Sequence, residues 1–238
     1  MRHRIWWRPD RAAWWMGVLF AIGSALFLGP AIASLWSAAD AVFVAFFAGS
    51  IFFTGAATVQ LAAAFEVPHR LRQRVGAVRE RPLRPRSWMP AHVDWLSAAI
   101  QWPGTILFNV NTFEALDRAL TATQQDVRVW TPDMIGSGCF LASSLLAFAN
   151  TEHRWLSWRP RDLDWWIALA NLVGSVAFAI SAVASFVRPA TGAAVNDTIA
   201  ALGTAVGAVG FLAGAVLLLP HYEQRVQAAT LSRRSCRR

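Results

Sequence analysis

The chain has 238 residues, of which 55% are apolar and 15% are charged, and its 22 basic residues outnumber its 14 acidic ones. Such a composition excludes an ordinary soluble domain and an intrinsically disordered chain. A net charge of +8 on a soluble surface would suggest nucleic-acid binding, but here the charges lie between long uncharged stretches, which indicates a membrane protein. Every basic residue is arginine, which is typical of a GC-rich bacterial genome.

Six stretches are predicted to be transmembrane helices, since a bilayer core about 30 Å thick needs roughly 20 apolar residues per helix. The third is more polar than the others and, taken alone, also fits a re-entrant or interfacial helix. The six predicted helices cover residues 13–36, 40–65, 93–113, 133–150, 165–187 and 197–219. We therefore expect an all-α membrane protein with three connections on the external side of the membrane, near 37–39, 111–131 and 188–196.

The arginines predict the orientation of these helices. If all six span, 19 arginines fall on one side, in the N-terminal segment, the second and fourth connections and the C-terminal tail. Only Arg118, Arg128 and Arg188 fall on the other side. Because basic residues accumulate on the cytoplasmic side, both termini are predicted to be cytoplasmic, in a bacterial plasma membrane. Omitting the third helix would move the arginine-rich tail outside, so the charge pattern favours six spans.

A signal peptide is the competing interpretation of the N-terminus. Arginines precede the first apolar stretch, and Ala31-Ile32-Ala33 resembles a cleavage site. The stretch nevertheless continues to Trp36, and its pattern recurs later in the chain. We therefore expect the first helix to be retained.

Each predicted helix contains one copy of a short pattern: a glycine, a small residue, two variable positions and a phenylalanine. In the odd-numbered helices the pattern extends back by nine residues to Trp14, Trp95 and Trp165. The six copies begin and end at Gly23 and Phe27, Gly49 and Phe53, Gly104 and Phe108, Gly136 and Phe140, Gly174 and Phe178, and Gly207 and Phe211. The chain therefore reads as three tandem two-helix hairpins of the same orientation, which are parallel repeats.

The predicted divisions of the chain follow from this repeat. A first hairpin at 1–66 is followed by an arginine-rich cytoplasmic loop at 67–92 and a second, divergent hairpin at 93–152. A third hairpin occupies 153–222, and a basic cytoplasmic tail occupies 223–238. The segments Trp7-Arg8-Pro9 and Trp158-Arg159-Pro160 precede the first and fifth helices, where Trp and Arg suit the membrane interface.

A hairpin with Gly-Ser-x-x-Phe in each helix, preceded by basic and aromatic residues, resembles the YrhK-like membrane domain. The resemblance is best over residues 4–66 and 155–222 and weaker over 92–152, where the connection is longer and more polar. The family is small and bacterial. The resemblance implies membrane hairpins and identifies no catalytic or binding residue.

The glycine pattern has a simple physical interpretation. Glycine and phenylalanine at positions i and i+4 share a helix face, and the ring leans toward the N-terminus over the surface that the glycine leaves open. Small residues there allow a neighbouring helix to approach closely in lipid. We expect a helix-packing site; a ligand or lipid cleft is the alternative.

A polar stripe on the third predicted helix is the main candidate for a site. Gln101, Thr105 and Asn109 are spaced four apart and so share one face. Asn171 in the fifth helix stands three residues before its glycine, as Gln101 does. Because amides in lipid must find partners, we expect hydrogen bonds between helices, with a polar path or a small-solute site as the alternative.

No catalytic residue, cofactor site or metal site is predicted. The five histidines fall near helix ends or in loops without metal-ligand spacing, and Cys139 and Cys236 lie in different environments. No charged residue or histidine is predicted inside a span, whereas ion-coupled carriers keep such groups there. No nucleophile or phosphate-binding motif occurs in a suitable context, which argues against an enzyme.

The sequence thus predicts a non-enzymatic helix bundle that serves a structural, lipid-interacting or partner-binding role. A small channel or transporter for a neutral solute is the alternative. The expected partners are the bilayer itself and anionic lipid headgroups at the cytoplasmic face. A membrane or cytoplasmic protein partner, for which the arginine-rich loop is a candidate docking arm, or a homo-oligomer is also compatible with the pattern.

Overall fold

The computed structural model describes residues 11–37, 39–74, 92–150 and 160–235, and for 66–74 and 221–235 it describes the backbone alone. This part of the chain is helical, apart from turns and one isolated β-bridge between Val187 and Ala194. The elements are α1 (Ala12–Ala33), α2 (Asp40–Arg74), α3 (Val93–Glu114), α4 (Ala122–Gln125), the π-helical turn η2 (Asp126–Trp130), α5 (Thr131–Asn150), α6 (Leu163–Ala184) and α7 (Asp197–Ser235).

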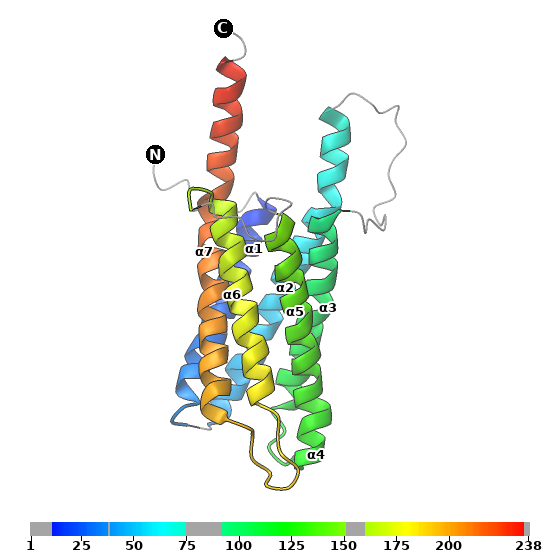
Figure 1. Cartoon of the computed structure of the whole chain (residues 1–238), viewed down its shortest axis with the longest axis vertical. Helices are drawn as coiled ribbons and strands as arrows, with labels where there is room; N and C mark the ends of the chain where they lie inside the picture. The colour runs from blue at the N-terminus through cyan, green and yellow to red at the C-terminus, as the bar shows by residue number, and fades with distance from the viewer. Residues whose placement is uncertain (1–10, 38, 75–91, 151–159, 236–238) are drawn as a thin grey trace.

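The six long helices form a closed ring whose order follows the chain. Each packs on its sequence neighbours, so that α1 contacts α2, α2 contacts α3, α3 contacts α5, α5 contacts α6 and α6 contacts α7. The ring is closed because α7 also packs along α1. Successive helices run in opposite directions, so α1, α3 and α6 begin at one end of the bundle, shown at the top in Figure 1. We call this end the N-end, and the opposite end, where α4 lies, the loop end.

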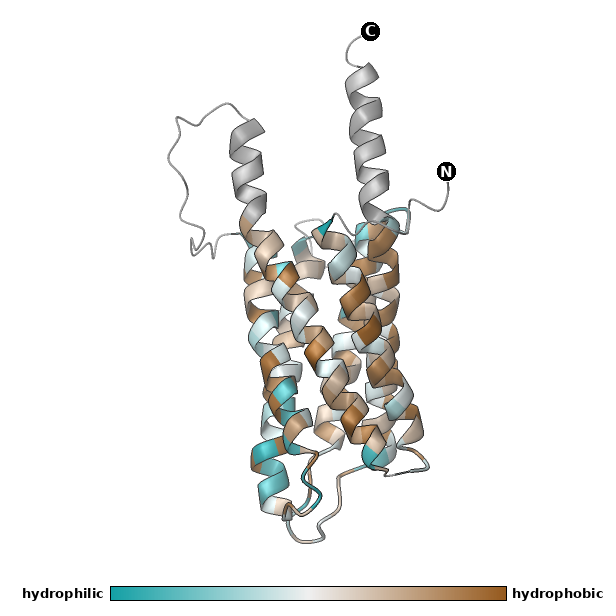
Figure 2. Ribbon diagram, turned by 180° about the vertical axis from the view of Figure 1, so that it is seen from behind, coloured by the Kyte–Doolittle hydropathy of each residue, from teal (hydrophilic) through white to brown (hydrophobic). Residues whose placement is uncertain are grey.

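Five helical segments are long and apolar enough to cross a bilayer, which makes this a multi-pass membrane architecture. They are Ala12–Ala33, Asp40–Phe65, Ala122–Asn150, Leu163–Ala184 and Asp197–Pro220. Apolar residues cover the sides of the bundle, while hydrophilic residues gather toward the loop end (Figure 2). The 22-residue helix α3 is as long as α1 and α6 but is too polar to meet the same criterion.

The helix boundaries differ from the predicted ones at several ends. Helix α1 ends at Ala33 and α6 at Ala184, each three residues earlier than expected. Helices α2 and α7 run on to Arg74 and Ser235, so parts of the predicted arginine-rich loop and basic tail are helical. Both helices continue past a proline, Pro68 in α2 and Pro220 in α7, and the arginine, glutamine and alanine residues beyond these prolines favour helix. Residues 1–10, 75–91 and 151–159, including Trp7-Arg8-Pro9, Trp158 and Arg159, lie outside the described residues.

The two glycines of each hairpin face one another at a close approach of the helices. A Cβ atom added to Gly23 would lie 3.1 Å from the carbonyl oxygen of Gly49, and one added to Gly49 would lie 3.1 Å from that of Gly23. Equivalent contacts join Gly104 to Gly136 and Gly174 to Gly207. Since side chains larger than hydrogen do not fit there, glycine allows the two backbones to touch.

Each glycine also receives a phenylalanine from the other helix of its hairpin. A Cβ atom on Gly174 would lie 2.9 Å from the ring of Phe211, and one on Gly207 would lie 2.8 Å from the ring of Phe178. The same reciprocal contact joins the hairpin of α1 with α2 and that of α3 with α5. The ring therefore covers the partner helix's glycine, a contact that the sequence pattern did not identify.

The close approach predicts a position-specific cost of substitution. Gly174→Leu should lower the free energy of unfolding by about 1 to 3 kcal/mol, because a side chain at 174 meets the backbone of Gly207 and the ring of Phe211. The matched control is Val173→Leu, because Val173 is 48% exposed on the outside of the bundle. Thermal unfolding of both variants in detergent measures the difference, and equal stability of the two would contradict this packing.

Candidate functional site

The repeated phenylalanines meet at the centre of the ring, although they come from six different helices. Each ring contacts two rings from the other hairpins and one ring from its own hairpin. We call this cluster the phenylalanine core; its members are Phe27, Phe53, Phe108, Phe140, Phe178 and Phe211. The contacts between rings define two triangles. One comes from the helices that begin at the N-end, and the other comes from the helices that run in the opposite direction.

The first triangle comes from α1, α3 and α6, which begin at the N-end. The ring centroids of Phe27, Phe108 and Phe178 are 5.9 to 6.4 Å apart. Most of these contacts are edge-to-face, an arrangement that aromatic quadrupoles favour. One corresponding residue from each hairpin thus forms this triangle.

The second triangle comes from α2, α5 and α7, which run the other way. The centroids of Phe53, Phe140 and Phe211 are 5.4 to 6.2 Å apart, and all three pairs are edge-to-face. Contacts within each hairpin, with centroids 4.9 to 5.5 Å apart, join the two triangles.

The phenylalanine core closes the middle of the bundle to water. Its six rings are between 0% and 6% exposed, so a water-sized probe scarcely reaches any of them. Contacts between aromatic rings also leave no row of polar groups along which water or an ion moves. The axis of the ring of helices is therefore blocked at this level.

A cavity of about 390 Å³ lies between the phenylalanine core and the N-end. All six long helices contribute to its wall, and Phe20 and Phe211 belong to its apolar lining. A volume of this size accommodates a small metabolite. Its polar and acidic lining residues are Gln60, Asp94, Gln101, Asn150, Asp162, Asp164 and Asn171.

Gln101 and Asn171 occupy equivalent positions of the repeat, three residues before Gly104 and Gly174. Phe20 occupies the same position before Gly23 in α1. All three residues line the cavity. These positions are equivalent in the three hairpins, but the side chains differ: one is a phenylalanine and two are amides.

The amide of Gln101 is only partly used by its neighbours. Its Oε1 accepts hydrogen bonds from Oγ of Ser143 at 3.2 Å and from Nε2 of Gln60 at 3.4 Å. The side chain is 8% exposed, and its Nε2 donates to no acceptor in the described part of the chain. An amide nitrogen with no acceptor in the described structure is an available donor in the cavity wall.

Asn171 also lines the cavity. Its Oδ1 packs against Gly214, where an added Cβ atom would lie only 2.6 Å away, so a larger residue at 214 would displace it. Within the described residues the side-chain amide makes no hydrogen bond, while the backbone carbonyl accepts from Ser144 and Ser175. Both a donor and an acceptor are therefore available at this wall.

The other members of the predicted polar stripe bind α2 to α3. Asn109 donates from Nδ2 to Oγ1 of Thr54 at 2.9 Å, and Thr54 donates to the carbonyl oxygen of Thr105 at 3.3 Å. Thr105 is fully buried and donates to its own helix at Trp102. The stripe is thus divided: Thr105 and Asn109 lie in a helix interface, whereas Gln101 and Asn171 line the cavity.

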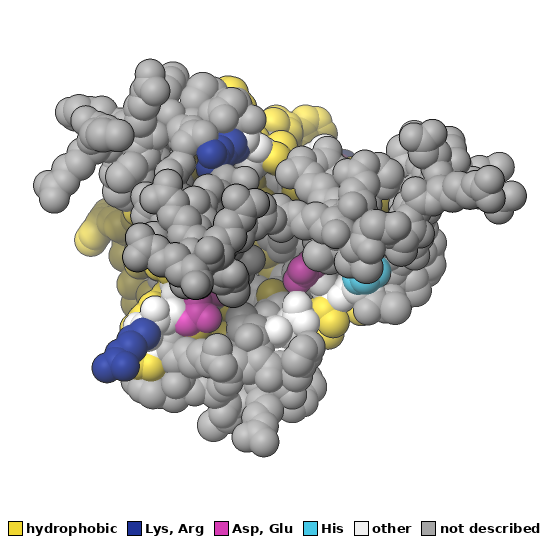
Figure 3. Space-filling model, turned by 90° about the horizontal axis from the view of Figure 1, so that it is seen from above, with side chains coloured by type: hydrophobic (Ala, Val, Ile, Leu, Met, Phe, Trp, Pro, Cys, Tyr) yellow, Lys and Arg dark blue, Asp and Glu magenta, His cyan; other side chains and the backbone are white. Residues whose placement is uncertain are grey.

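Carboxylates lie at the N-end of the cavity. Asp94, in the first turn of α3, accepts a hydrogen bond at Oδ1 from Nδ2 of Asn150 at 3.0 Å. Asp162 caps α6 by accepting from the backbone N–H of Asp164 at 3.0 Å. Acidic side chains are visible among polar groups in the view of this end (Figure 3). The described cavity lining includes three acidic residues and no basic one.

A further carboxylate lies near the loop end, at the start of α5. Asp133 is in the first turn of α5, and its Oδ1 accepts from Nδ2 of the buried Asn111 at 2.9 Å. Asp133 is partly buried and lies at the start of α5, as it lies at the start of the predicted helix 133–150.

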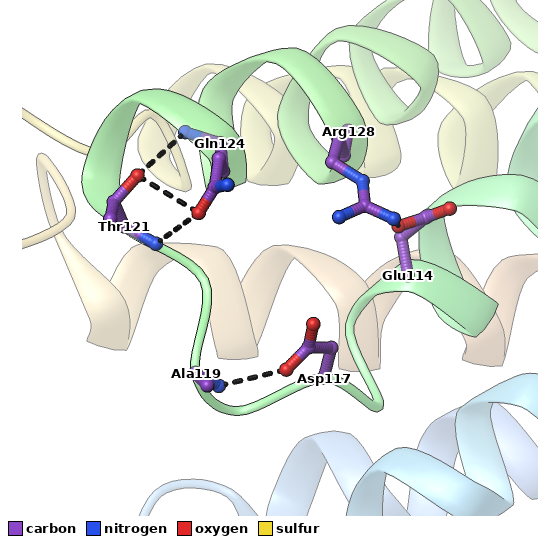
Figure 4. A network of polar contacts seen from close by, with 6 residues as sticks. All are labelled: Glu114, Asp117, Ala119, Thr121, Gln124 and Arg128. Carbon is purple, nitrogen blue, oxygen red and sulfur yellow. Dashed lines mark hydrogen bonds and ion pairs between the residues drawn. The ribbon is translucent and has the colours of Figure 1, made fainter.

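The loop end carries a separate polar network that shapes the connection between α3 and α5 (Figure 4). Arg128 pairs with Glu114 at 2.6 Å, and Thr121 and Gln124 form a capping box at the start of α4. Asp117 accepts a backbone N–H two residues further on at 3.0 Å. The capping box provides hydrogen bonds for backbone N–H groups at the start of α4. The ion pair links the end of α3 to η2.

The described residues hold no group of three or more His, Cys, Asp or Glu side chains arranged for a metal ion. Cys139 is a partly buried thiol against Gly104. Of the histidines, His92 precedes α3, whereas His3 and His153 lie outside the described residues. His69 and His221 lie in α2 and α7, where only the backbone is described.

The search for related proteins found no match to this chain among family models, curated proteins or solved structures. The resemblance to the YrhK-like domain therefore stays a prediction. The arguments below rest on the geometry of the bundle.

The phenylalanine core predicts a large loss of stability on truncation of one ring. Phe140→Ala should lower the free energy of unfolding by about 3 to 5 kcal/mol, because Phe140 is fully buried against three other rings. Phe113→Ala is the matched control, since Phe113 is 57% exposed. Thermal unfolding in detergent compares the two, and a similar loss in both variants would argue against a common core.

Proposed function

We propose that this chain is a non-enzymatic membrane protein of the bacterial plasma membrane that binds a small polar molecule in its cavity from the cytoplasmic side. The observation that carries the proposal is a polar cavity at one end of a bundle whose centre is blocked by aromatic rings. Such a shape suits binding better than passage. A binding protein needs one access route, whereas a channel needs two.

All six long helices span the bilayer in this proposal, as three parallel hairpins. Helix α3 has the same length as α1 and α6 and packs between α2 and α5. Its polar side chains face those neighbours, where Asn109 bonds Thr54 and Gln101 bonds Ser143. Polar groups that are satisfied between helices do not prevent a helix from crossing the membrane.

The N-end faces the cytoplasm in this proposal. The arginine distribution supports this orientation, since 19 of the 22 arginines lie before α1, after α5, or in the C-terminal parts of α2 and α7 and the segments that follow them. The same arginines suit anionic lipid headgroups, which we propose as the surrounding surface. We also propose membership of the YrhK-like family, which the Gly-Ser-x-x-Phe hairpins support.

A carrier for a neutral solute is the second candidate. The amides of Gln101 and Asn171 favour it, because neutral donors and acceptors suit uncharged polar solutes. A carrier would, however, have to separate the phenylalanine core in each cycle and break contacts among six rings. Liposomes that contain the purified protein should therefore show no flux of urea or glycerol above empty liposomes, and flux would favour the carrier.

The orientation predicts the accessibility of both ends. Alkaline phosphatase fused after Arg238 should be inactive, because this enzyme folds only outside the cytoplasm. A cysteine at Gln125, in the loop-end connection, should react with a membrane-impermeant maleimide in intact cells. An active fusion, or a protected cysteine at 125, would contradict the six-span arrangement.

The cavity predicts labelling from one side of the membrane. The native cysteines are first removed by Cys139→Ala and Cys236→Ser. In this background Ala147→Cys should react with a hydrophilic maleimide in inside-out vesicles, because Ala147 lines the cavity. The same cysteine should not react in intact cells. The matched control is Leu145→Cys in the same helix, since Leu145 lies on the outer surface and should contact lipid. Labelling of Ala147→Cys from outside, or from neither side, would overturn the proposed access route.

A further inference from the structure

The cavity has two chemically different ends, and their spacing restricts what it binds. Asp94 stands seven residues before Gln101 in α3, and Asp164 stands seven residues before Asn171 in α6. On an α-helix this separation is a rise of about 10 Å. The carboxylates therefore lie toward the N-end, and the amides lie about two turns deeper, beside Phe20 and Phe211.

Two carboxylates at the outer level make no ion pair in the described part of the chain. Asp94 accepts from the neutral amide of Asn150, and Asp162 accepts from a backbone N–H. No described basic side chain lines the cavity. Two negative groups at the mouth of one cavity attract a cation and repel an anion.

An independent observation at the inner level points to a bound molecule. Nε2 of Gln101 belongs to a side chain that is more than nine-tenths buried, yet it has no acceptor among the described residues. The amide of Asn171, also in the wall, has neither donor nor acceptor there. Since both amides line the cavity and keep unused hydrogen-bonding groups, they are available to a ligand that both donates and accepts.

We propose that the cavity binds a linear organic amine whose far end carries an amide or a hydroxyl group. The ammonium group lies between Asp94 and Asp162, and the neutral polar end bonds Gln101 and Asn171. The two levels are about 10 Å apart along the helices, so a short alkyl chain joins the two polar groups, and a chain of four carbons is the one tested. Phe20 and Phe211 pack against the chain. This inference rests on the proposed binding function and names its ligand class.

N-acetylputrescine is the probe, since it carries an ammonium group and an acetamide at the two ends of a four-carbon chain. Butylamine lacks the amide, N-butylacetamide lacks the charge, and N-acetyl-γ-aminobutyrate carries a carboxylate in place of the ammonium. Binding to the full chain in detergent is measured by titration calorimetry, and protection of Ala147→Cys from maleimide reports occupancy of the cavity. N-acetylputrescine should bind at least about tenfold more tightly than each comparison compound.

Variants separate the contributions of the two ends. Asp94→Asn with Asp162→Asn should weaken N-acetylputrescine by about tenfold or more and leave N-butylacetamide unchanged. Asn171→Leu should reduce the preference for N-acetylputrescine over butylamine. The hydrogen bonds that serine side chains make to Asn171 use its backbone carbonyl, so among the described residues this substitution breaks no side-chain hydrogen bond. Asp117→Asn is the matched control, because Asp117 lies in the loop-end connection.

Several results would overturn this ligand class. They are equal or tighter binding of N-acetyl-γ-aminobutyrate, binding that survives loss of both Asp94 and Asp162, and failure of every probe to protect Ala147→Cys. If Ala147→Cys still reacts from the cytoplasmic side in that last case, only the ligand class is wrong. If it does not react from that side, the proposed binding function fails as well.

Discussion

The contact between glycine and phenylalanine within each hairpin is the constraint on which the rest of the bundle depends. Where Gly174 faces Gly207, the two backbones approach until neither position has space for a Cβ atom. Each phenylalanine then covers the glycine of the opposite helix and reaches the centre of the bundle. In lipid, burial of apolar surface contributes little to helix association. This close packing supplies stronger dispersion contacts than the lipid tails make with the same helix surfaces.

The same contact explains why six rings meet at one level. Each hairpin places one ring from each of its antiparallel helices next to the crossing point, so three hairpins around an axis bring six rings together. The phenylalanine core therefore needs closure of the ring of helices, which α7 provides by packing on α1. A bundle built this way is blocked at its centre by the same residues that hold it together.

The polar lining of the cavity comes from positions at which the three hairpins differ, and not from the residues that they share. Position three before the first glycine of a hairpin is Phe20 in one, Gln101 in the second and Asn171 in the third. Eleven residues after the second glycine, the cavity wall contains Gln60, Ala147 and Leu218. Packing requires like residues near the crossing points, whereas at these positions, about one and about three turns from the glycines, the hairpins carry different residues. Polar side chains have accumulated there, which explains a polar cavity directly above an apolar core.

The sequence by itself predicted the helical segments and the shared face of each glycine and phenylalanine, because charge-free stretches and a spacing of four residues are local properties of a helix. It also identified Gln101 and Asn171 as unusual polar residues in a membrane. It did not predict that α2 and α7 continue as helices past Pro68 and Pro220, because proline is a local signal for a helix end. Only the tertiary structure decided that each ring packs on its partner's glycine and that Gln101 and Asn171 share one cavity with Asp94 and Asp162. Periodicity determines which residues share a helix face, but the neighbour of that face depends on how distant hairpins close into a ring.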